Sequence, residues 1–169
     1  KTQDPNRYFE AVEYGYGIFT GEHECSVTGD SSVLDKCVEL LKNAFSLIKA
    51  KQDKSLSLNA AKKAQIAFND PALTRYKDDF INIFVDHLTD AANYGSLDAM
   101  NELYNIYKDG VVVEEDNQKA FAWLLKLGET GNSDAQLQIA DYYSEGEFVA
   151  QNLTGAVNWY GKAAKSNAI

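Results

Sequence analysis

The sequence predicts an all-α protein, an α-solenoid of about four antiparallel helical hairpins in a single repeat domain over residues 1–169. Two features of the composition favour this class. The chain has only two prolines, and its ten tyrosines, eight phenylalanines and two tryptophans can pack helix against helix. Its contents of 45% hydrophobic and 24% charged residues are ordinary for a globular protein. A repeat of thirty-six residues in the C-terminal half is the third observation, and it is typical of solenoids.

The first hairpin is predicted over residues 5–50. Ala11, Gly15 and Phe19 are spaced four residues apart, so they share one face of a helix that ends near Gly21. A loop that contains both cysteines separates this helix from the next. The apolar face of the second helix consists of Cys37, Leu40, Leu41, Ala44 and Ile48.

The second hairpin is predicted over residues 54–93. Ala60, Ala64 and Phe68 repeat the same spacing, and Pro71 stands near the place where the first helix should end. We expect His87 to be a core residue of the second helix, hydrogen-bonded to a neighbouring carboxylate. The core positions of that helix are Phe84, His87, Ala91 and Ala92, and the neighbouring carboxylates are Asp86 and Asp90.

The third and fourth hairpins are predicted over residues 96–130 and 132–168, because these segments are two copies of one pattern. At an offset of thirty-six residues they match without a gap, and the match includes the only two tryptophans. We expect both to be interior spacers between hairpins, with Trp159 partly exposed because it belongs to the terminal hairpin. The matching pairs are Gly95 and Gly131, Asp98 and Asp134, Ala99 and Ala135, Tyr107 and Tyr143, Gly110 and Gly146, Ala120 and Ala156, Trp123 and Trp159, and Lys126 and Lys162.

Each copy contains the signals of two helices and a turn. Ala99, Leu103 and Tyr107 lie on one face of the first helix, and Gly110 is expected to end that helix in the left-handed conformation. Asp116 is expected to cap the second helix. In the second copy the corresponding residues are Ala135, Ile139, Tyr143, Gly146 and Asn152.

The two copies resemble the Sel-one-like repeat, a relative of the tetratricopeptide repeat. The segments AMNELYNIYKDGVVVEEDNQKAFAWLLKLGETG and AQLQIADYYSEGEFVAQNLTGAVNWYGKAAKSN follow the family pattern closely. They depart from it at Tyr104, which replaces a small residue, and at Val112 and Phe148, which replace a glycine. The resemblance covers residues 95–168, and it implies a right-handed α-solenoid that binds other proteins.

The net charge of −9 lies entirely in the C-terminal half. Residues 76–169 carry six lysines and fifteen acidic residues, whereas residues 1–75 carry ten residues of each sign. An acidic surface repels phosphate groups, which disfavours nucleic acid and anionic membrane surfaces as partners. No run approaches the eighteen apolar residues of a membrane span. We therefore expect a basic protein as the partner.

The chain has two cysteines, Cys25 and Cys37, and an even count separated by a loop favours a disulfide between them. The sequence begins at Lys1 rather than at methionine, which is consistent with a removed signal peptide. Both observations favour a periplasmic or secreted protein, and two reduced cysteines in a cytosolic protein are the alternative. A zinc site at His23 beside the cysteines would have too few ligands. We expect no metal and no cofactor.

The candidate binding surface follows from the shape of a solenoid, whose first helices line the concave face. Away from the core, the first helices of the two copies carry a polar surface with a net negative charge and some aromatic side chains, which suits a protein partner. The alternative is that these residues only keep the helices soluble. We expect Tyr104 and Tyr142 to face outward. The candidate partner-binding residues are Asn101, Glu102, Tyr104, Asn105, Gln138, Asp141, Tyr142 and Glu145.

Two classes of function are compatible with these features. The resemblance implies a non-catalytic binding module, most simply an exported immunity or inhibitor protein that binds a secreted antibacterial toxin. A periplasmic assembly scaffold or a regulator of an envelope enzyme is the alternative. An enzyme is a distant alternative, since motifs of nucleophilic, phosphate-binding and metalloprotease sites are missing from the sequence. A deep pocket that holds His23 or His87 beside carboxylates would favour the enzyme. The sequence leaves the oligomeric state open.

Overall fold

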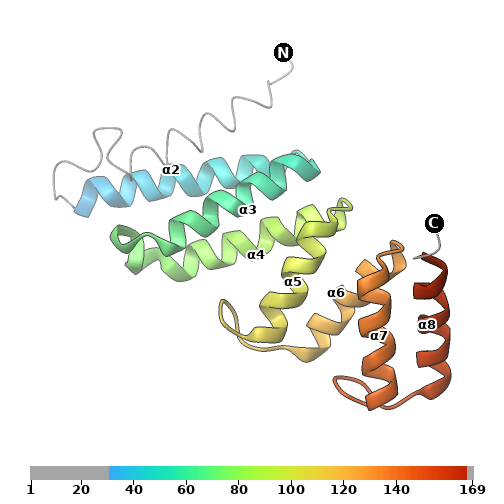
Figure 1. Ribbon diagram of the computed structural model, residues 1–169. Coiled ribbons are helices and arrows are strands. Elements are labelled where there is room, and N and C mark those ends of the chain that lie inside the picture. The colour runs from blue at the N-terminus through green and yellow to red at the C-terminus, as the bar shows by residue number, and fades with distance from the viewer. Residues whose placement is uncertain (1–30, 167–169) are drawn as a thin grey trace. The chain divides into compact units, whose positions relative to one another are not determined.

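The computed structural model describes residues 31–166, and every regular element within them is helical (Figure 1). Backbone packing divides the chain into two compact units, Lys1–Ser96 and Leu97–Ile169. The boundary falls between the second and third predicted hairpins. None of the helices in residues 31–166 is both long and apolar enough to cross a membrane. The all-α class is as predicted, and the expected helix before Gly21 lies outside the described residues.

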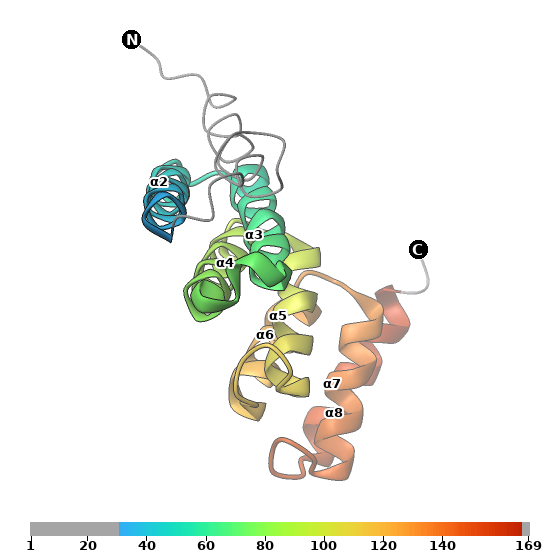
Figure 2. The same cartoon turned by 90° about the vertical axis from the view of Figure 1, so that its left-hand side faces the viewer.

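The N-terminal unit contains α2 (Ser31–Lys49), α3 (Lys54–Asn69), the 3-10 helix η2 (Pro71–Tyr76) and α4 (Lys77–Asn93). Helices α3 and α4 lie side by side and correspond to the predicted hairpin 54–93 (Figures 1 and 2). The carboxylate of Asp70 accepts a hydrogen bond of 2.9 Å from the backbone nitrogen of Ala72, so the turn at Pro71 is capped. The proline therefore separates the two helices, as its position in the sequence indicated.

Small residues allow the close approach of α3 and α4. Ala60 and Ala64 on α3 are fully buried, and a larger side chain at either position would separate the helices. Beyond them, the rings of Phe68 and Phe84 meet edge to face, with centroids 5.5 Å apart. Helix α2 adds Phe45, which is buried against His87 of α4 at 5.6 Å between ring centroids. The predicted core positions of α4 are all buried.

The C-terminal unit contains α5 (Leu97–Asp109), α6 (Asn117–Glu129), α7 (Ser133–Glu145) and α8 (Leu153–Ser166). Helices α5 and α6 form one hairpin and α7 and α8 form the next, and α6 packs against α7. These hairpins correspond to the predicted segments 96–130 and 132–168.

The turns of the two hairpins have the same geometry, as the repeat predicts. Gly110 and Gly146 follow α5 and α7 with φ angles of +64° and +75°, a left-handed conformation that glycine adopts without strain. The backbone nitrogens of Asp116 and Asn152 donate to a tyrosine carbonyl of the preceding helix, at 2.8 and 2.7 Å. The side chains of the same two residues accept hydrogen bonds of 2.9 Å from backbone nitrogens three residues later. Both capping predictions are confirmed.

The two hairpins of this unit meet tightly at Gly128 of α6. A Cβ atom at this position would lie 2.5 Å from Cδ1 of Ile139 on α7 and 3.3 Å from Cζ3 of Trp159 on α8. Ordinary contacts between carbon atoms are 3.5–4.0 Å, so the missing side chain is what lets the hairpins stack.

Both tryptophans are only half-buried, so the expected interior position is wrong in part for Trp123, whereas Trp159 is partly exposed as its place in the terminal hairpin indicated. Trp159 does lie against the preceding hairpin, at Gly128. The ammonium of Lys126 lies 3.9 Å from the ring centroid of Trp123, and that of Lys162 lies 3.6 Å from the centroid of Trp159. In each repeat a lysine three residues further along the helix therefore lies over one face of the indole ring. Because the ammonium group stays hydrated, that face of the ring lies near solvent.

Candidate protein-binding site

Helices α5 and α7 line a groove of about 270 Å³ in the C-terminal unit. The exposed residues Asp98 and Asp134 lie along it, at equivalent positions of the two repeats. Asn101 and Gln138, two of the predicted binding residues, line the same groove. Leu124 and other apolar side chains contribute its remaining surface. We refer to this feature as the α5–α7 groove.

Local sequence positions the acidic residues of the groove. The side chain of Asn132 accepts a hydrogen bond of 2.9 Å from the backbone nitrogen of Ala135, which fixes the start of α7. Asp134 then lies in the first turn of α7, and Asp98 lies in the first turn of α5. A carboxylate in the first turn is stabilised by the helix dipole, so these residues also have a structural role.

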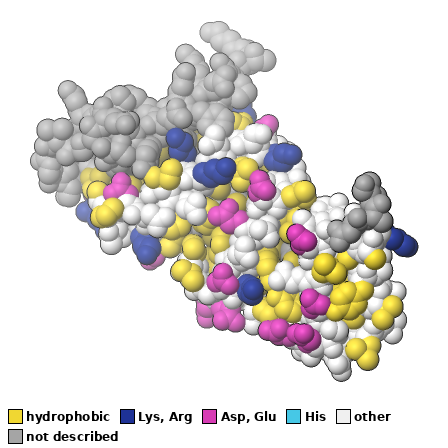
Figure 3. Space-filling view, in the orientation of Figure 1, with side chains coloured by type: hydrophobic (Ala, Val, Ile, Leu, Met, Phe, Trp, Pro, Cys, Tyr) yellow, Lys and Arg dark blue, Asp and Glu magenta, His cyan; other side chains and the backbone are white. Residues whose placement is uncertain are grey.

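The surroundings of the groove are acidic. Residues 97–166 carry five lysines and eleven acidic residues, and Figure 3 shows acidic side chains spread over this part of the molecule. A cleft lined by one sign of charge raises the local concentration of oppositely charged partners. The groove therefore favours a ligand with basic groups.

The structure brings together only part of the predicted binding residues. Asp141 does not line the α5–α7 groove, and its Oδ1 accepts a hydrogen bond of 2.5 Å from the hydroxyl of Tyr160 on α8. This bond raises the pKa of Tyr160. Asn101, Asn105, Asp141 and Glu145 are exposed, and Glu102 and Gln138 are half-buried.

Tyr104 and Tyr142 do not face outward, so that prediction is wrong. They are 3% and 7% exposed, and their hydroxyl oxygens are 2.7 Å apart in a hydrogen bond inside the unit. Burial, followed by this hydrogen bond, raises the pKa of Tyr104 well above its ordinary value. The ring of Tyr142 also packs on Phe121 and on Phe148, at centroid distances of 6.2 and 4.6 Å. The pair is therefore part of the core.

The repeat contained a signal for this burial. Tyr142 stands thirty-six residues after Ile106, an apolar residue that is also buried. Tyr104 aligns with Ala140, so a large residue in the first repeat corresponds to a small one in the second. Asp98 and Asp134 are the groove residues that sequence reasoning missed. Their exact alignment at the start of each first helix, on a position that is not part of the core, was the available signal.

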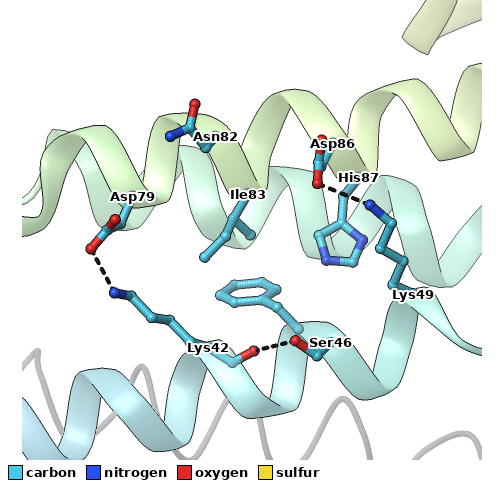
Figure 4. Close-up of a pocket in the computed structure, with 9 residues that line it drawn as sticks. Lys42, Ser46, Lys49, Asp79, Asn82, Ile83, Asp86 and His87 are labelled. Atoms are coloured by element: carbon cyan, nitrogen blue, oxygen red, sulfur yellow. Dashed lines mark hydrogen bonds and ion pairs between the residues drawn. The ribbon is translucent and has the colours of Figure 1, made fainter.

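A second cavity, of about 310 Å³, lies between α2 and α4 (Figure 4). Two ion pairs flank it, Lys42 with Asp79 at 2.5 Å and Lys49 with Asp86 at 2.9 Å. His87 also lines it, so the cavity has the combination of histidine and carboxylates that would favour an enzyme. The chemistry of the imidazole decides what this arrangement can do.

The imidazole of His87 is 2% exposed, and burial lowers its pKa to about 4, with the charge of Lys49 acting in the same direction. Its Nδ1 atom is buried without a hydrogen-bond partner. The predicted bond to a carboxylate is wrong, because Asp86 pairs with Lys49 instead and Oδ2 of Asp90 is itself buried without a partner. The lowered pKa keeps the imidazole uncharged at neutral pH, and the ring contributes to the core through its contact with Phe45.

The cysteine and metal predictions fall mainly on residues that are not described. Cys37 is buried on α2, whereas Cys25 and His23 lie outside residues 31–166, so the disulfide stays a prediction. In residues 31–166, histidine, cysteine and acidic side chains form no cluster of three that could hold a metal ion.

Comparison with known families identifies the repeats. The model of the Sel1 repeat matches residues 97–132 and 133–167, one match for each hairpin of the C-terminal unit. Residues 97–167 are two Sel1 repeats. The Sel1 repeat is the Sel-one-like repeat to which the sequence pattern pointed, and such repeats form protein-interaction modules. A binding role of the C-terminal unit is supported on this ground.

Solved structures include similar proteins, whereas no curated protein matches the chain. A Sel1 repeat protein from Oxalobacter formigenes is 25% identical, with a TM-score of 0.49 over 71% of this chain and 88% of its own. Cysteine-rich protein B of Helicobacter pylori is 24% identical, with a TM-score of 0.45 over 49% of this chain and 62% of its own. The c5321 protective antigen of uropathogenic Escherichia coli, which has an SLR fold, is 21% identical, with a TM-score of 0.50 over 97% of this chain and 33% of its own. This last likeness concerns the fold alone, and it supports the α-solenoid class.

Proposed function

We propose that this protein is an exported immunity or inhibitor protein that binds a basic protein, a secreted antibacterial toxin, through the α5–α7 groove. The observation that carries the proposal is the pair of exposed carboxylates, Asp98 and Asp134, that the repeat places along one groove. Acidic inhibitors attract basic partners over several ångströms, which increases the association rate. The groove supports a binding role, since it combines these charges with the amides of Asn101 and Gln138.

The test requires a partner, which cross-linking in the native host can supply. Binding kinetics are then measured at two salt concentrations for the double variant Asp98→Lys and Asp134→Lys. We expect the association rate to fall about tenfold at low salt, with a weaker dependence on salt, because charges near an interface act mainly on encounter.

The matched control is the double variant Glu114→Lys and Glu115→Lys, which changes the net charge by the same amount. Both residues are exposed in the turn between α5 and α6, and they do not line the α5–α7 groove. The control should slow association much less than the groove variant. Equal effects of the two variants would mean that only total charge matters, and the groove would be the wrong site.

Co-expression tests the biological role. If the partner is a toxin, the wild-type chain should restore growth of a susceptible cell and the groove variant should fail to do so. Recovery of an envelope enzyme as the partner would instead favour the alternative role of a periplasmic scaffold or regulator. We place the protein in the periplasm or outside the cell, in line with the predicted disulfide, and cell fractionation checks this location.

A further inference from the structure

Helix α8 has an apolar face that no other described helix covers. Leu153, Val157 and Tyr160 are 63%, 69% and 39% exposed, and Ala164 is also exposed. Successive members of this set are four, three and four residues apart, so they form one stripe along the helix. The adjacent side of α8 carries Ala156 and Ala163, which are buried against α7. We call the four exposed residues the α8 stripe.

The repeat indicates what such a stripe is suited to contact. Val157 and Tyr160 correspond to Phe121 and Leu124 on α6, which are 7% and 1% exposed. These residues of α6 are buried because the next hairpin packs on them, and the ring of Phe121 lies 5.6 Å from that of Tyr143 on α7. The same positions on α8 have no such cover within residues 31–166. The α8 stripe is therefore a surface for packing against a helix.

We propose that the α8 stripe binds the α8 stripe of a second copy of this chain, with the two helices antiparallel. A twofold axis between residues 158 and 159 would place Leu153 of one copy opposite Ala164 of the other, and Val157 opposite Tyr160. Leucine would then pack on alanine and valine on tyrosine, and each of the four positions of one copy would contact a position of the other. Such self-complementarity is what an isologous dimer requires.

Pairing of two α8 stripes would bury neither a charge of the stripe nor an unpaired hydroxyl group. None of its four residues is charged, so pairing buries no charge on the stripe. The hydroxyl of Tyr160 already donates to Asp141, so its ring can be covered without leaving the phenol unpaired. Figure 3 shows apolar side chains gathered over α7 and α8 at this end of the unit.

The size of the contact sets the expected affinity. A stable interface buries about 800 Å² on each partner, and four side chains of one helix supply less than this. We therefore expect a reversible dimer in the range of micromolar to tens of micromolar. Sedimentation velocity from about 1 to 500 µM should show the mass rise from monomer toward dimer, because this range brackets such a dissociation constant.

Variants distinguish this specific contact from non-specific self-association. Val157→Lys should raise the dissociation constant at least tenfold, whereas Val111→Lys should leave it unchanged, because Val111 is 86% exposed in the turn between α5 and α6. Circular dichroism checks that both variants are folded. A monomer at every concentration would overturn the proposal, as would a dimer that Val157→Lys does not weaken.

A cross-link tests the antiparallel arrangement. Val157 is exposed on the α8 stripe and lies next to the proposed axis, so Val157→Cys should form a disulfide-linked dimer on mild oxidation. Val111→Cys, at a distant exposed position, should not. Equal cross-linking of both variants would contradict the arrangement. These outcomes are independent of the α5–α7 groove, because the measurements use the protein alone.

Discussion

Replacing Gly128 by alanine tests the packing of the two Sel1 repeats at its tightest point. The added methyl group would lie 2.5 Å from Cδ1 of Ile139 and 3.3 Å from Cζ3 of Trp159. Ile139 is fully buried on α7, so its side chain cannot swing into solvent to make room. The backbone of α7 or the ring of Trp159 has to move instead.

Two opposing effects set the magnitude. Alanine is better than glycine in a helix by about 1 kcal/mol, which alone would stabilise α6. An extra carbon in a well-packed interior costs about 1–3 kcal/mol. We therefore expect Gly128→Ala to lower the free energy of unfolding by about 1 kcal/mol, which corresponds to a Tm lower by roughly 2–4 °C for a chain of this size.

The assay is thermal and urea unfolding followed by circular dichroism, with Gly161→Ala as the control. Gly161 lies on α8, and a Cβ atom there would have no neighbour within 4 Å, so this variant should be more stable by about 0.5–1 kcal/mol. Adding Ile139→Val to Gly128→Ala removes the atom in the closest contact, and should recover part of the loss. If Gly128→Ala stabilised the protein as much as Gly161→Ala does, the hairpins would not meet at Gly128 as described.

Three further predictions concern stability. The imidazole of His87 has a pKa of about 4 in the folded chain and about 6.5 in the unfolded chain, so only the unfolded chain binds the proton between these pH values. The free energy of unfolding should therefore fall by about 3 kcal/mol as the pH drops from 7 to 4. In a pH series of urea titrations, His87→Phe should flatten this part of the profile. Tyr104→Phe and Tyr142→Phe should each cost about 1–2 kcal/mol by leaving a buried hydroxyl unpaired, and the double variant should cost less than the sum of the two in a thermodynamic cycle. A disulfide between Cys25 and Cys37 should contribute roughly 2–3 kcal/mol, so a reducing agent should lower the Tm; two reactive thiols in native protein would contradict it.

The sequence predicted the hairpins of the C-terminal unit because their signals are local. A left-handed glycine and a capping side chain act within a few residues, so Gly146 and Asn152 could be assigned from spacing alone. The turn at Pro71 is of the same kind. Repetition then confirmed each signal by showing it twice.

Burial on the first helices was harder to predict, because it depends on contacts between hairpins. Tyr142 looks amphipathic in the sequence, but its neighbours include Phe121, which comes from another hairpin. Whether a ring points inward is set by that neighbour and not by the helix itself. For the same reason the α5–α7 groove, with Asp98 and Asp134 along it, became visible only once α5 and α7 were placed together.

The position of the two tryptophans allows intrinsic fluorescence to report whether the two units unfold cooperatively. Trp123 and Trp159 are the only indoles of the sequence, and both belong to the C-terminal unit. Emission excited selectively at the indoles therefore follows the unfolding of that unit alone, whereas far-ultraviolet circular dichroism sums the helices of both. Coincident midpoints in the two signals would mean that the units unfold as one. A dichroism step without a matching change in emission would assign that step to the N-terminal unit, and no label would have to be attached to see it.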